Sequence, residues 1–222
     1  MDSLIRDGFA VISGAVPTDA VGPLADAYDR AVLEADRCDV RHGSTTTRVD
    51  DLVNRGPEFD PLYVYPPLLE ACRSILGTDI KLSTMLARTL RPATPPQELH
   101  QDFPRDGRGW TMVGFIFMID EFRAENGATC FLPGSHLSGR MADVRPVPAC
   151  GRPGSVLIYN GAVWHGHGSN ETPLPRRSIQ GAFLRRDLKS GFDLPGRMRP
   201  ETLARIGPAA RSLILGDDSK RQ

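Results

Sequence analysis

The chain has 222 residues, of which 40% are hydrophobic and 24% are charged, and its 27 basic side chains balance 27 acidic ones. This composition excludes a disordered chain, and the length suffices for one sizeable core, so we expect a single domain over residues 1–222. The zero net charge and the lack of a basic run argue against nucleic acid or an anionic membrane as a partner. We therefore expect a protein that acts on a small molecule.

Cysteine usage and the start of the chain predict a cytoplasmic protein. The four cysteines lie far apart and form no Cys-x-x-Cys pair, so neither a zinc knuckle nor a redox motif is predicted. The first residues lack the basic and apolar regions of a signal peptide, and the longest strongly apolar run, residues 112–119, is too short to cross a bilayer.

The first part of the chain, residues 1–78, is predicted to be mainly helical. Thr18 and Asp19 offer an N-cap, after which apolar residues recur at spacings of three and four, which predicts an amphipathic helix. These apolar residues are Val21, Leu24, Tyr28 and Val32. A second helix is predicted from Pro67 to Leu76, with Gly77 as its stop signal. The polar segment between the two helices, from Arg37 to Phe59, shows no periodicity and is interpreted as a long loop or lid over a binding site.

From Ile80 onward a period of two, which is typical of strands, replaces the helical pattern. Further short strands are predicted at residues 111–119, 128–132, 155–159 and 178–184, separated by glycine, proline and asparagine. Many short strands at such spacing indicate a sandwich or jelly roll, here over residues 79–187. The tail, residues 188–222, is predicted to be partly helical, with a break at Gly207-Pro208.

His100 and Asp102 are the first candidate site residues, because they place an imidazole and a carboxylate two positions apart. On a strand this spacing points both side chains to one side. His165 follows a short strand and precedes a glycine, which lets it approach a metal ion closely. Two histidines and one carboxylate on one side of a metal, with the opposite positions open, form the facial triad of non-haem iron(II) oxygenases. The sequence therefore predicts an iron site.

Arg176, eleven residues after His165, is the candidate partner for an anionic cosubstrate. An iron(II) dioxygenase that uses 2-oxoglutarate binds the far carboxylate of this oxo acid through a cation. Arginine suits this role because it stays charged and forms a two-pronged fork. Arg177 is expected to point the other way, since neighbouring residues of a strand face opposite sides.

Most of the chain resembles the phytanoyl-CoA dioxygenase family of iron(II)- and 2-oxoglutarate-dependent oxygenases. The resemblance rests on Asp7-Gly8-Phe9, Leu99–Phe103, Glu125-Asn126-Gly127 with Leu132–His136, and Trp164-His165-Gly166 with Asn170 and Arg176. It implies a mainly β fold with flanking helices, a cupin-like double-stranded β-helix.

The resemblance also implies roles for individual residues. His100, Asp102 and His165 would be the iron ligands, and Arg176 would hold 2-oxoglutarate. Met85 and Gln101 match positions that line the cosubstrate site in family members. His167 departs from the family pattern, in which a small hydroxyl residue is common.

We therefore expect a hydroxylase that uses Fe(II), 2-oxoglutarate and O2, and that releases succinate and CO2 while it oxidises a small organic molecule or natural-product intermediate. Desaturation and epoxidation stay open. Phe103, Trp110 and Phe59 are candidate walls of the substrate pocket. The alternatives are a cupin-type metalloenzyme that does not use 2-oxoglutarate, and a non-catalytic jelly roll that binds a small molecule. Oligomeric state and the role of His136 stay open.

Overall fold

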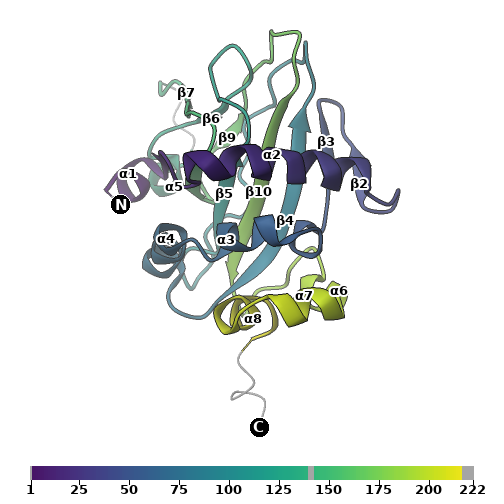
Figure 1. Cartoon of the computed structure of the whole chain (residues 1–222). Coiled ribbons are helices and arrows are strands. Elements are labelled where there is room, and N and C mark those ends of the chain that lie inside the picture. The colour runs from purple at the N-terminus through teal and green to yellow at the C-terminus, as the bar shows by residue number, and fades with distance from the viewer. Residues whose placement is uncertain (1, 140–142, 217–222) are drawn as a thin grey trace.

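The computed structural model describes residues 2–139 and 143–216, and a large antiparallel sheet lies at its centre (Figure 1). Seven strands form this sheet in the order β1-β8-β5-β10-β4-β3-β2, and β7-β6-β9 form a second, three-stranded sheet. Two antiparallel sheets with helices outside them confirm the predicted mainly β, jelly-roll fold class. The strands are β1 (Phe9–Ile12), β2 (Val40–His42), β3 (Thr46–Val49), β4 (Ile80–Leu90), β5 (Met112–Met118), β6 (Thr129–Phe131), β7 (Val147–Pro148), β8 (Val156–Asn160), β9 (His165–His167) and β10 (Arg176–Arg185).

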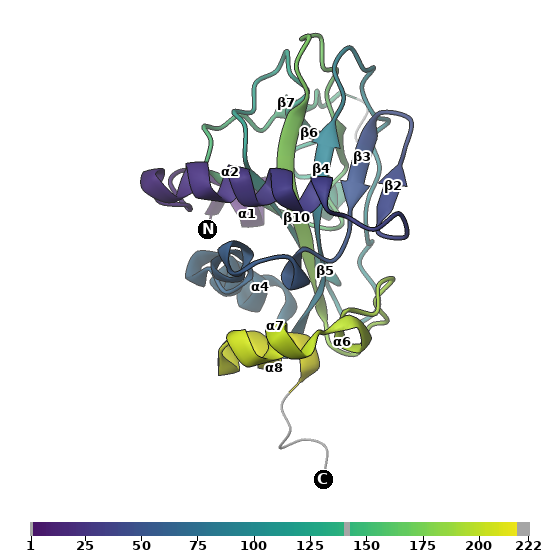
Figure 2. The ribbon, with the colours of Figure 1, turned by 45° about the vertical axis from the view of Figure 1, so that its right-hand side comes forward.

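Helices cover one face of the larger sheet. The longest of them, α2 (Thr18–Leu33) and α4 (Pro66–Leu76), lie on this face together with α8 (Pro208–Leu215) (Figure 2). Within the described residues no helix has the length and apolar character needed to cross a membrane. The other helical segments are α1 (Asp2–Asp7), α3 (Asp60–Tyr63), α5 (Ser135–Ser138), α6 (Leu194–Arg197), α7 (Pro200–Arg205) and the 3-10 turns Leu52–Asn54 and Pro57–Phe59.

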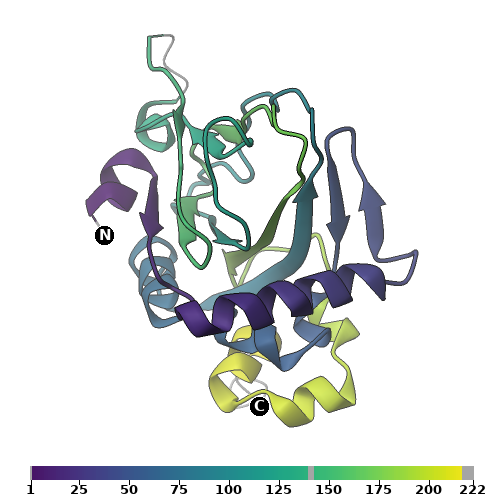
Figure 3. The same cartoon turned by 45° about the horizontal axis from the view of Figure 1, so that its top comes forward.

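Strand alternation divides the core into two layers. On β5, Phe115 and Phe117 pack with helix residues such as Leu68, whereas Ile116 packs with Phe131 of the smaller sheet. The smaller sheet accordingly lies against the face of the larger sheet that the helices leave free (Figure 3). All of β5 is buried because both of its faces are covered, which explains why this strand is an unbroken apolar run in the sequence.

Both predicted helices of the first part are present. The second begins at Pro66, and Gly77 follows its end with a φ of 88°, a conformation that favours glycine. The apolar positions predicted for the first helix lie within α2, where Leu24 and Tyr28 are buried. The predicted N-cap was wrong, because Pro17 precedes the first turn and no side chain caps it.

The interpretation of the segment from Arg37 to Phe59 as a long loop or lid was also wrong. It forms the hairpin of β2 and β3, and β3 pairs with β4, so this hairpin extends the larger sheet. Its strands are three and four residues long and largely part-exposed, and they therefore carry too little apolar alternation to be recognised in the sequence. With β1, the part predicted as mainly helical, residues 1–78, supplies three strands of that sheet.

The tail forms α6, α7 and α8, and the predicted break at Gly207-Pro208 is confirmed, because α7 ends at Arg205 and α8 begins at Pro208. Residues 217–222 of the predicted tail lie outside the described residues.

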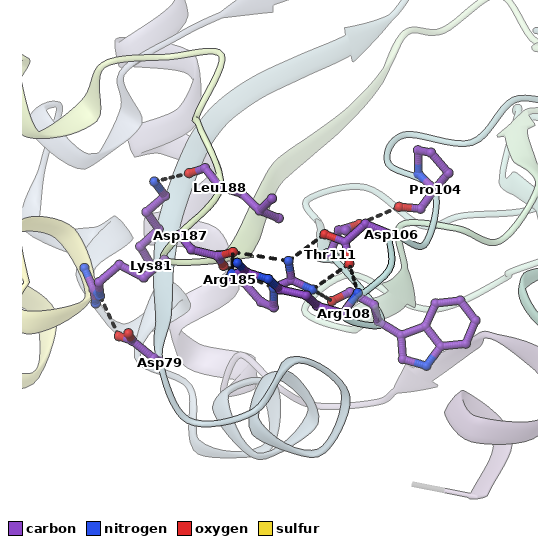
Figure 4. A network of polar contacts seen from close by, with 11 residues as sticks. Asp79, Lys81, Pro104, Asp106, Arg108, Thr111, Arg185, Asp187 and Leu188 are labelled. Carbon is purple, nitrogen blue, oxygen red and sulfur yellow. Dashed lines mark hydrogen bonds and ion pairs between the residues drawn. The ribbon is translucent and has the colours of Figure 1, made fainter.

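A network of ion pairs fixes the hairpin that follows residue 103 against the end of β10 (Figure 4). Arg185 contacts Asp106 at 2.6 Å and Asp187 at 3.1 Å, and Arg108 contacts Asp187 at 2.9 Å. Since Asp106, Arg108 and Asp187 are exposed, each pair contributes little to the free energy of unfolding. The network joins the segment between Asp102 and β5 to the end of β10.

Candidate metal centre and its cavity

His100, Asp102 and His165 come together in the structure, with one potential ligand atom of each within 4.8 Å of the others. His165 is the first residue of β9, so it lies on a strand of its own and not in the loop after β8. His100 and Asp102, however, do not lie on a regular strand; they belong to the irregular connection between β4 and β5. The expectation that a strand would align them was therefore wrong, although the two side chains do converge.

Backbone pairing takes the place of the expected strand. The amide N–H of His100 donates to the carbonyl of His165 at 2.9 Å, and the reverse bond has the same length. The amide of Asp102 donates to the carbonyl of Gly161 at 3.0 Å, and the Gln101 amide group donates to the carbonyl of Ala162. Each bond joins the His100 segment to the His165 segment, so the ligands are positioned by contacts between distant parts of the chain.

Hydrogen bonds also orient both imidazoles. The Nδ1 atom of His100 lies 3.1 Å from the carbonyl of Glu98, and that of His165 lies 2.9 Å from the carbonyl of Val163. Because a carbonyl only accepts hydrogen bonds, Nδ1 carries the proton in each neutral ring. The unprotonated Nε2 therefore keeps the lone pair that can bind a metal ion. Both Nε2 atoms face the Asp102 carboxylate, at 3.6 Å for His100 and 3.5 Å for His165.

Asp102 is ionised in this environment. Burial opposes its charge, but the nearby imidazoles of His100 and His165 and the hydroxyl of Tyr159 outweigh burial and hold the pKa of Asp102 at about 2. The same carboxylate raises the pKa of His100, whereas burial lowers the pKa of His165. A carboxylate between two imidazole nitrogens is a donor set for a divalent cation.

Tyr159 orients the Asp102 carboxylate, because its hydroxyl donates a hydrogen bond to Oδ2 of Asp102 at 2.7 Å. We expect Tyr159→Phe to weaken metal binding about tenfold, because partners that orient a ligand typically contribute this much to affinity. Titration of the purified protein with Fe(II) measures the effect. Tyr28→Phe is the matched control: the Tyr28 hydroxyl pairs with Thr89 at 2.8 Å, and neither residue lines the cavity. Equal metal affinities of the two variants would contradict this role of Tyr159.

Gly114 provides the space that the Tyr159 ring occupies, because a Cβ at Gly114 would overlap the ring. We expect Gly114→Ala to lower the free energy of unfolding by about 1 to 3 kcal/mol through overpacking, and to weaken metal binding as Tyr159 moves. Gly107→Ala is the control, since a Cβ there meets nothing within 4 Å. Chemical denaturation measures both; an unfolding free energy of Gly114→Ala within about 0.5 kcal/mol of the parent would contradict the argument.

The three residues open into a cavity of about 380 Å³ between the two sheets. This volume is within the range of small-molecule sites. Apolar side chains from β4, β5 and β10 form much of the wall, namely Leu86, Met112, Ile116, Ala182 and Leu184.

Arg176 also lines this cavity, with 4% of its surface exposed. Its Nε donates to the carbonyl of Asn126 at 3.2 Å, and its guanidinium lies 3.8 Å from the centre of the Phe122 ring. Its buried Nη1 has no hydrogen-bond partner within residues 2–139 and 143–216. Burial, with a contribution from Arg88, lowers the pKa of Arg176 to about 9, so it stays charged at neutral pH. Arg177 points away, as expected, and pairs with Asp120 at 2.8 Å and Asp29 at 2.7 Å.

The other expected site residues divide into two groups. Phe103 lines the cavity, whereas Met85, Gln101, Phe59 and Trp110 do not. Met85 and Phe59 are 1% and 0% exposed and belong to the core between the helices and the larger sheet. Met85 fails as a pocket residue because strand alternation turns Leu86 and Arg88, not Met85, toward the cavity.

Trp110 and His136 lie outside the cavity and contact each other. Trp110 packs at the edge of the core, where its ring centre is 5.5 Å from that of His136. The Nε2 atom of His136 lies 3.0 Å from the carbonyl of Ile5, which connects α5 to α1. Trp110 and His136 therefore contribute to packing between parts of the fold and do not face the cavity.

The structure adds cavity residues that the sequence prediction missed, among them Arg88 and Gln180. β4 also carries Lys81, Ser83, Thr84 and Thr89, so its sequence offered no specific signal for Arg88. His167 lines the cavity as well, and its Nε2 lies 2.9 Å from the Thr45 hydroxyl in the β2–β3 turn. The hairpin of β2 and β3 thus borders the cavity, although it is not a loop.

The chain is similar to known dioxygenases. A profile of the family described as Phytanoyl-CoA dioxygenase (PhyH) matches residues 4–178. Dioxygenase swnH1 of Metarhizium robertsii is 32% identical over 155 residues, which cover 64% of this chain and 47% of that protein. Multifunctional dioxygenase prhA of Penicillium brasilianum is 26% identical over 217 residues, covering 83% of this chain and 71% of that protein. The chain spans about a third to a half of the first curated relatives it matches.

Solved structures share the fold. The α-ketoglutarate-dependent epimerase SnoN from nogalamycin biosynthesis superposes with a TM-score of 0.74 at 22% identity, covering 89% of both chains. HygX from Streptomyces hygroscopicus gives a TM-score of 0.68 at 18% identity, covering 84% of this chain and 86% of its own. Because the family profile matches more than half of the chain, the resemblance seen in the motifs is confirmed: the chain belongs to the phytanoyl-CoA dioxygenase family.

Proposed function

We propose that this protein is a single-domain Fe(II)- and 2-oxoglutarate-dependent dioxygenase that hydroxylates a small organic molecule. One observation carries the proposal: the His-Asp-His donor set lines the same cavity as Arg176, whose Nη1 has no hydrogen-bond partner among the described residues. The first feature suits a metal ion, and the second suits an anion next to it.

The donor set fits iron(II). Two neutral imidazole nitrogens and one ionised carboxylate converge, and a facial arrangement of such ligands leaves positions for a chelating cosubstrate and O2. When bound, the iron supplies the activation of O2 and the oxidising power for an unreactive C–H bond. His100, Asp102 and His165 would hold it, while the carbonyls of Glu98 and Val163 keep both imidazoles in the required tautomer.

Arg176 fits the far carboxylate of 2-oxoglutarate. Its Nη1 is a buried donor that lacks an acceptor, and leaving such a donor unpaired is costly, so an anion that accepts from it gains affinity. The Asn126 carbonyl and the Phe122 ring hold the guanidinium in place. In the balanced reaction one oxygen atom of O2 enters the hydroxyl group of the product and the other enters succinate, while 2-oxoglutarate loses CO2.

A small apolar or amphipathic substrate suits the apolar walls of the cavity. SnoN has been solved in complex with nogalamycin RO, and HygX has been solved with hygromycin B bound. These two neighbours support a natural-product intermediate as the substrate class here. We also retain the cytoplasmic location predicted from the sequence as part of this proposal; the free thiols of Cys38, Cys72, Cys130 and Cys150 suit a reducing compartment.

The decisive experiment tests the two ligands separately. Anaerobic addition of Fe(II) and 2-oxoglutarate is expected to give a weak visible charge-transfer band, and admission of O2 is expected to release succinate. Mass analysis of products from candidate metabolites then distinguishes hydroxylation from the epimerisation known for SnoN. Metal binding with O2 consumption but no need for 2-oxoglutarate would favour the cupin-type alternative. Folded protein that binds neither iron nor 2-oxoglutarate would contradict the proposal.

A further inference from the structure

The cavity contains more positive charge than the proposed cofactors require. Arg41, Arg48 and Arg88 line it in addition to Arg176, whereas Asp102 is the single carboxylate among the described residues of its lining. Arg41 is neutralised, because it contacts Asp50 at 2.6 Å. Arg48 and Arg88 have no carboxylate partner among the ion pairs of the described residues.

Arg88 makes hydrogen bonds only to neutral side chains among the described residues. Its guanidinium donates to the side-chain carbonyl of Gln180 at 3.1 Å and to that of Gln97 at 3.4 Å, and both partners are neutral. Burial, followed by repulsion from Arg48, lowers the pKa of Arg88 to about 10, which leaves it charged at neutral pH. A buried charge with only neutral partners is costly unless a ligand of opposite charge compensates it.

A count of formal charges shows what the ligand must supply. Under the proposed function, Fe(II) contributes two positive charges and 2-oxoglutarate two negative charges, while Asp102 and Arg176 cancel each other. The site is then neutral without Arg88 and Arg48. These two arginines therefore leave an excess of positive charge in the cavity.

We propose that the substrate is an organic acid whose carboxylate pairs with Arg88, assisted by Arg48. Arginine favours this group because its planar fork matches both carboxylate oxygens. Leu86 lies on the same side of β4 as Arg88, and Ala182 and Leu184 line the cavity from the neighbouring strand β10, so an apolar carbon skeleton attached to the carboxylate has a surface to pack against. Arg88 is in this way a specificity-determining residue. The inference rests on the proposed function, since the charge count includes iron and 2-oxoglutarate.

The test uses the full chain loaded with Ni(II), which supports no turnover, and with saturating 2-oxoglutarate. The probes are small aliphatic and aromatic carboxylic acids, each paired with the primary amide of the same skeleton. Calorimetric titration and the Tm shift measure binding. We expect acids to bind the parent protein at least about tenfold more tightly than their amides, the difference of one charged hydrogen bond. Arg88→Gln and Arg48→Gln should reduce this preference.

Two further variants complete the design. Arg88→Lys keeps the positive charge but loses the two-pronged guanidinium, and it should retain part of the preference for acids over amides. Arg108→Gln removes an arginine from the exposed network in Figure 4 and should leave the preference for acids unchanged. Should Arg88→Gln fail to fold, Arg48→Gln still tests the proposal, because Arg48 lies on the short strand β3 of the edge hairpin and not on the long central strand β4.

Three results would overturn the proposal. The first is that no acid binds more tightly than its amide. The second is that the preference survives in both Arg88→Gln and Arg48→Gln. The third is that Arg88→Gln raises the Kd of 2-oxoglutarate and leaves the preference intact, which would assign Arg88 to the cosubstrate. Failure of the proposed function is seen separately, because Ni(II) and 2-oxoglutarate binding to the parent protein is measured before any acid is added.

Discussion

Replacing Asp102 with alanine is expected to reduce succinate release coupled to substrate oxidation by more than about 100-fold, because even residues that merely orient a metal ligand contribute up to this much. Asp102 supplies the carboxylate of the donor set and lies 3.6 Å and 3.5 Å from the two imidazole nitrogens. Without it, two neutral imidazoles hold the metal alone. Titration with Fe(II) and measurement of succinate under air check the result.

Asp187→Ala serves as the control for Asp102→Ala. Asp187 is an exposed carboxylate that pairs with Arg185 and Arg108 away from the cavity, so its loss should leave iron affinity near that of the parent. If Asp102→Ala binds iron and turns over like Asp187→Ala, the metal centre lies elsewhere.

Arg176→Met is expected to weaken 2-oxoglutarate binding by about 100-fold, since two hydrogen bonds to a charged carboxylate together contribute about 3 kcal/mol or more. Iron binding should persist, because Arg176 is not a ligand. The protein without cofactors should be no less stable than the parent, since the change removes a buried charge whose Nη1 lacks a partner. Titration with 2-oxoglutarate and a thermal melt of the apoprotein measure these two effects.

Arg177→Met is the matched control, because it is the neighbouring arginine on the same strand but pairs with Asp120 and Asp29 on the outside. It should bind 2-oxoglutarate like the parent and melt at a lower temperature. The opposite pattern, with 2-oxoglutarate affinity lost in Arg177→Met and kept in Arg176→Met, would exclude Arg176 as the anchor.

His100, Asp102 and His165 converge in the structure, but not because a strand aligns the first two. His100 and Asp102 were expected to share a strand face, yet they lie on an irregular connection. They converge because His100 pairs with His165 through its backbone and Asp102 with Gly161. A spacing of two residues is informative about chemistry, but the orientation of these side chains depends on a partner segment far along the chain.

Predictions that required knowledge of the strand register were less successful. Met85 was expected in the pocket and lies in the core, while Arg88, three residues later, faces the cavity. A shift of one residue exchanges the two faces of a strand, and the register of β4 against β10 is interrupted by an irregularity between Ala182 and Phe183. Such an irregularity arises where β4 pairs with β10, so the sequence of β4 alone does not reveal it.

The sequence by itself determined the class of fold, the family, the two long helices and the identities of the three candidate ligands, because periodicity and motif spacing are local properties of the chain. Tertiary structure alone decided which residues share the cavity. It brought Arg88 and Arg48 into the same cavity as Arg176, formed an edge hairpin within the segment from Arg37 to Phe59, and buried Phe59. Burial and the excess of positive charge in the cavity depend on strand pairing between segments far apart in sequence. This excess of charge is the reason why we propose an acid as the substrate.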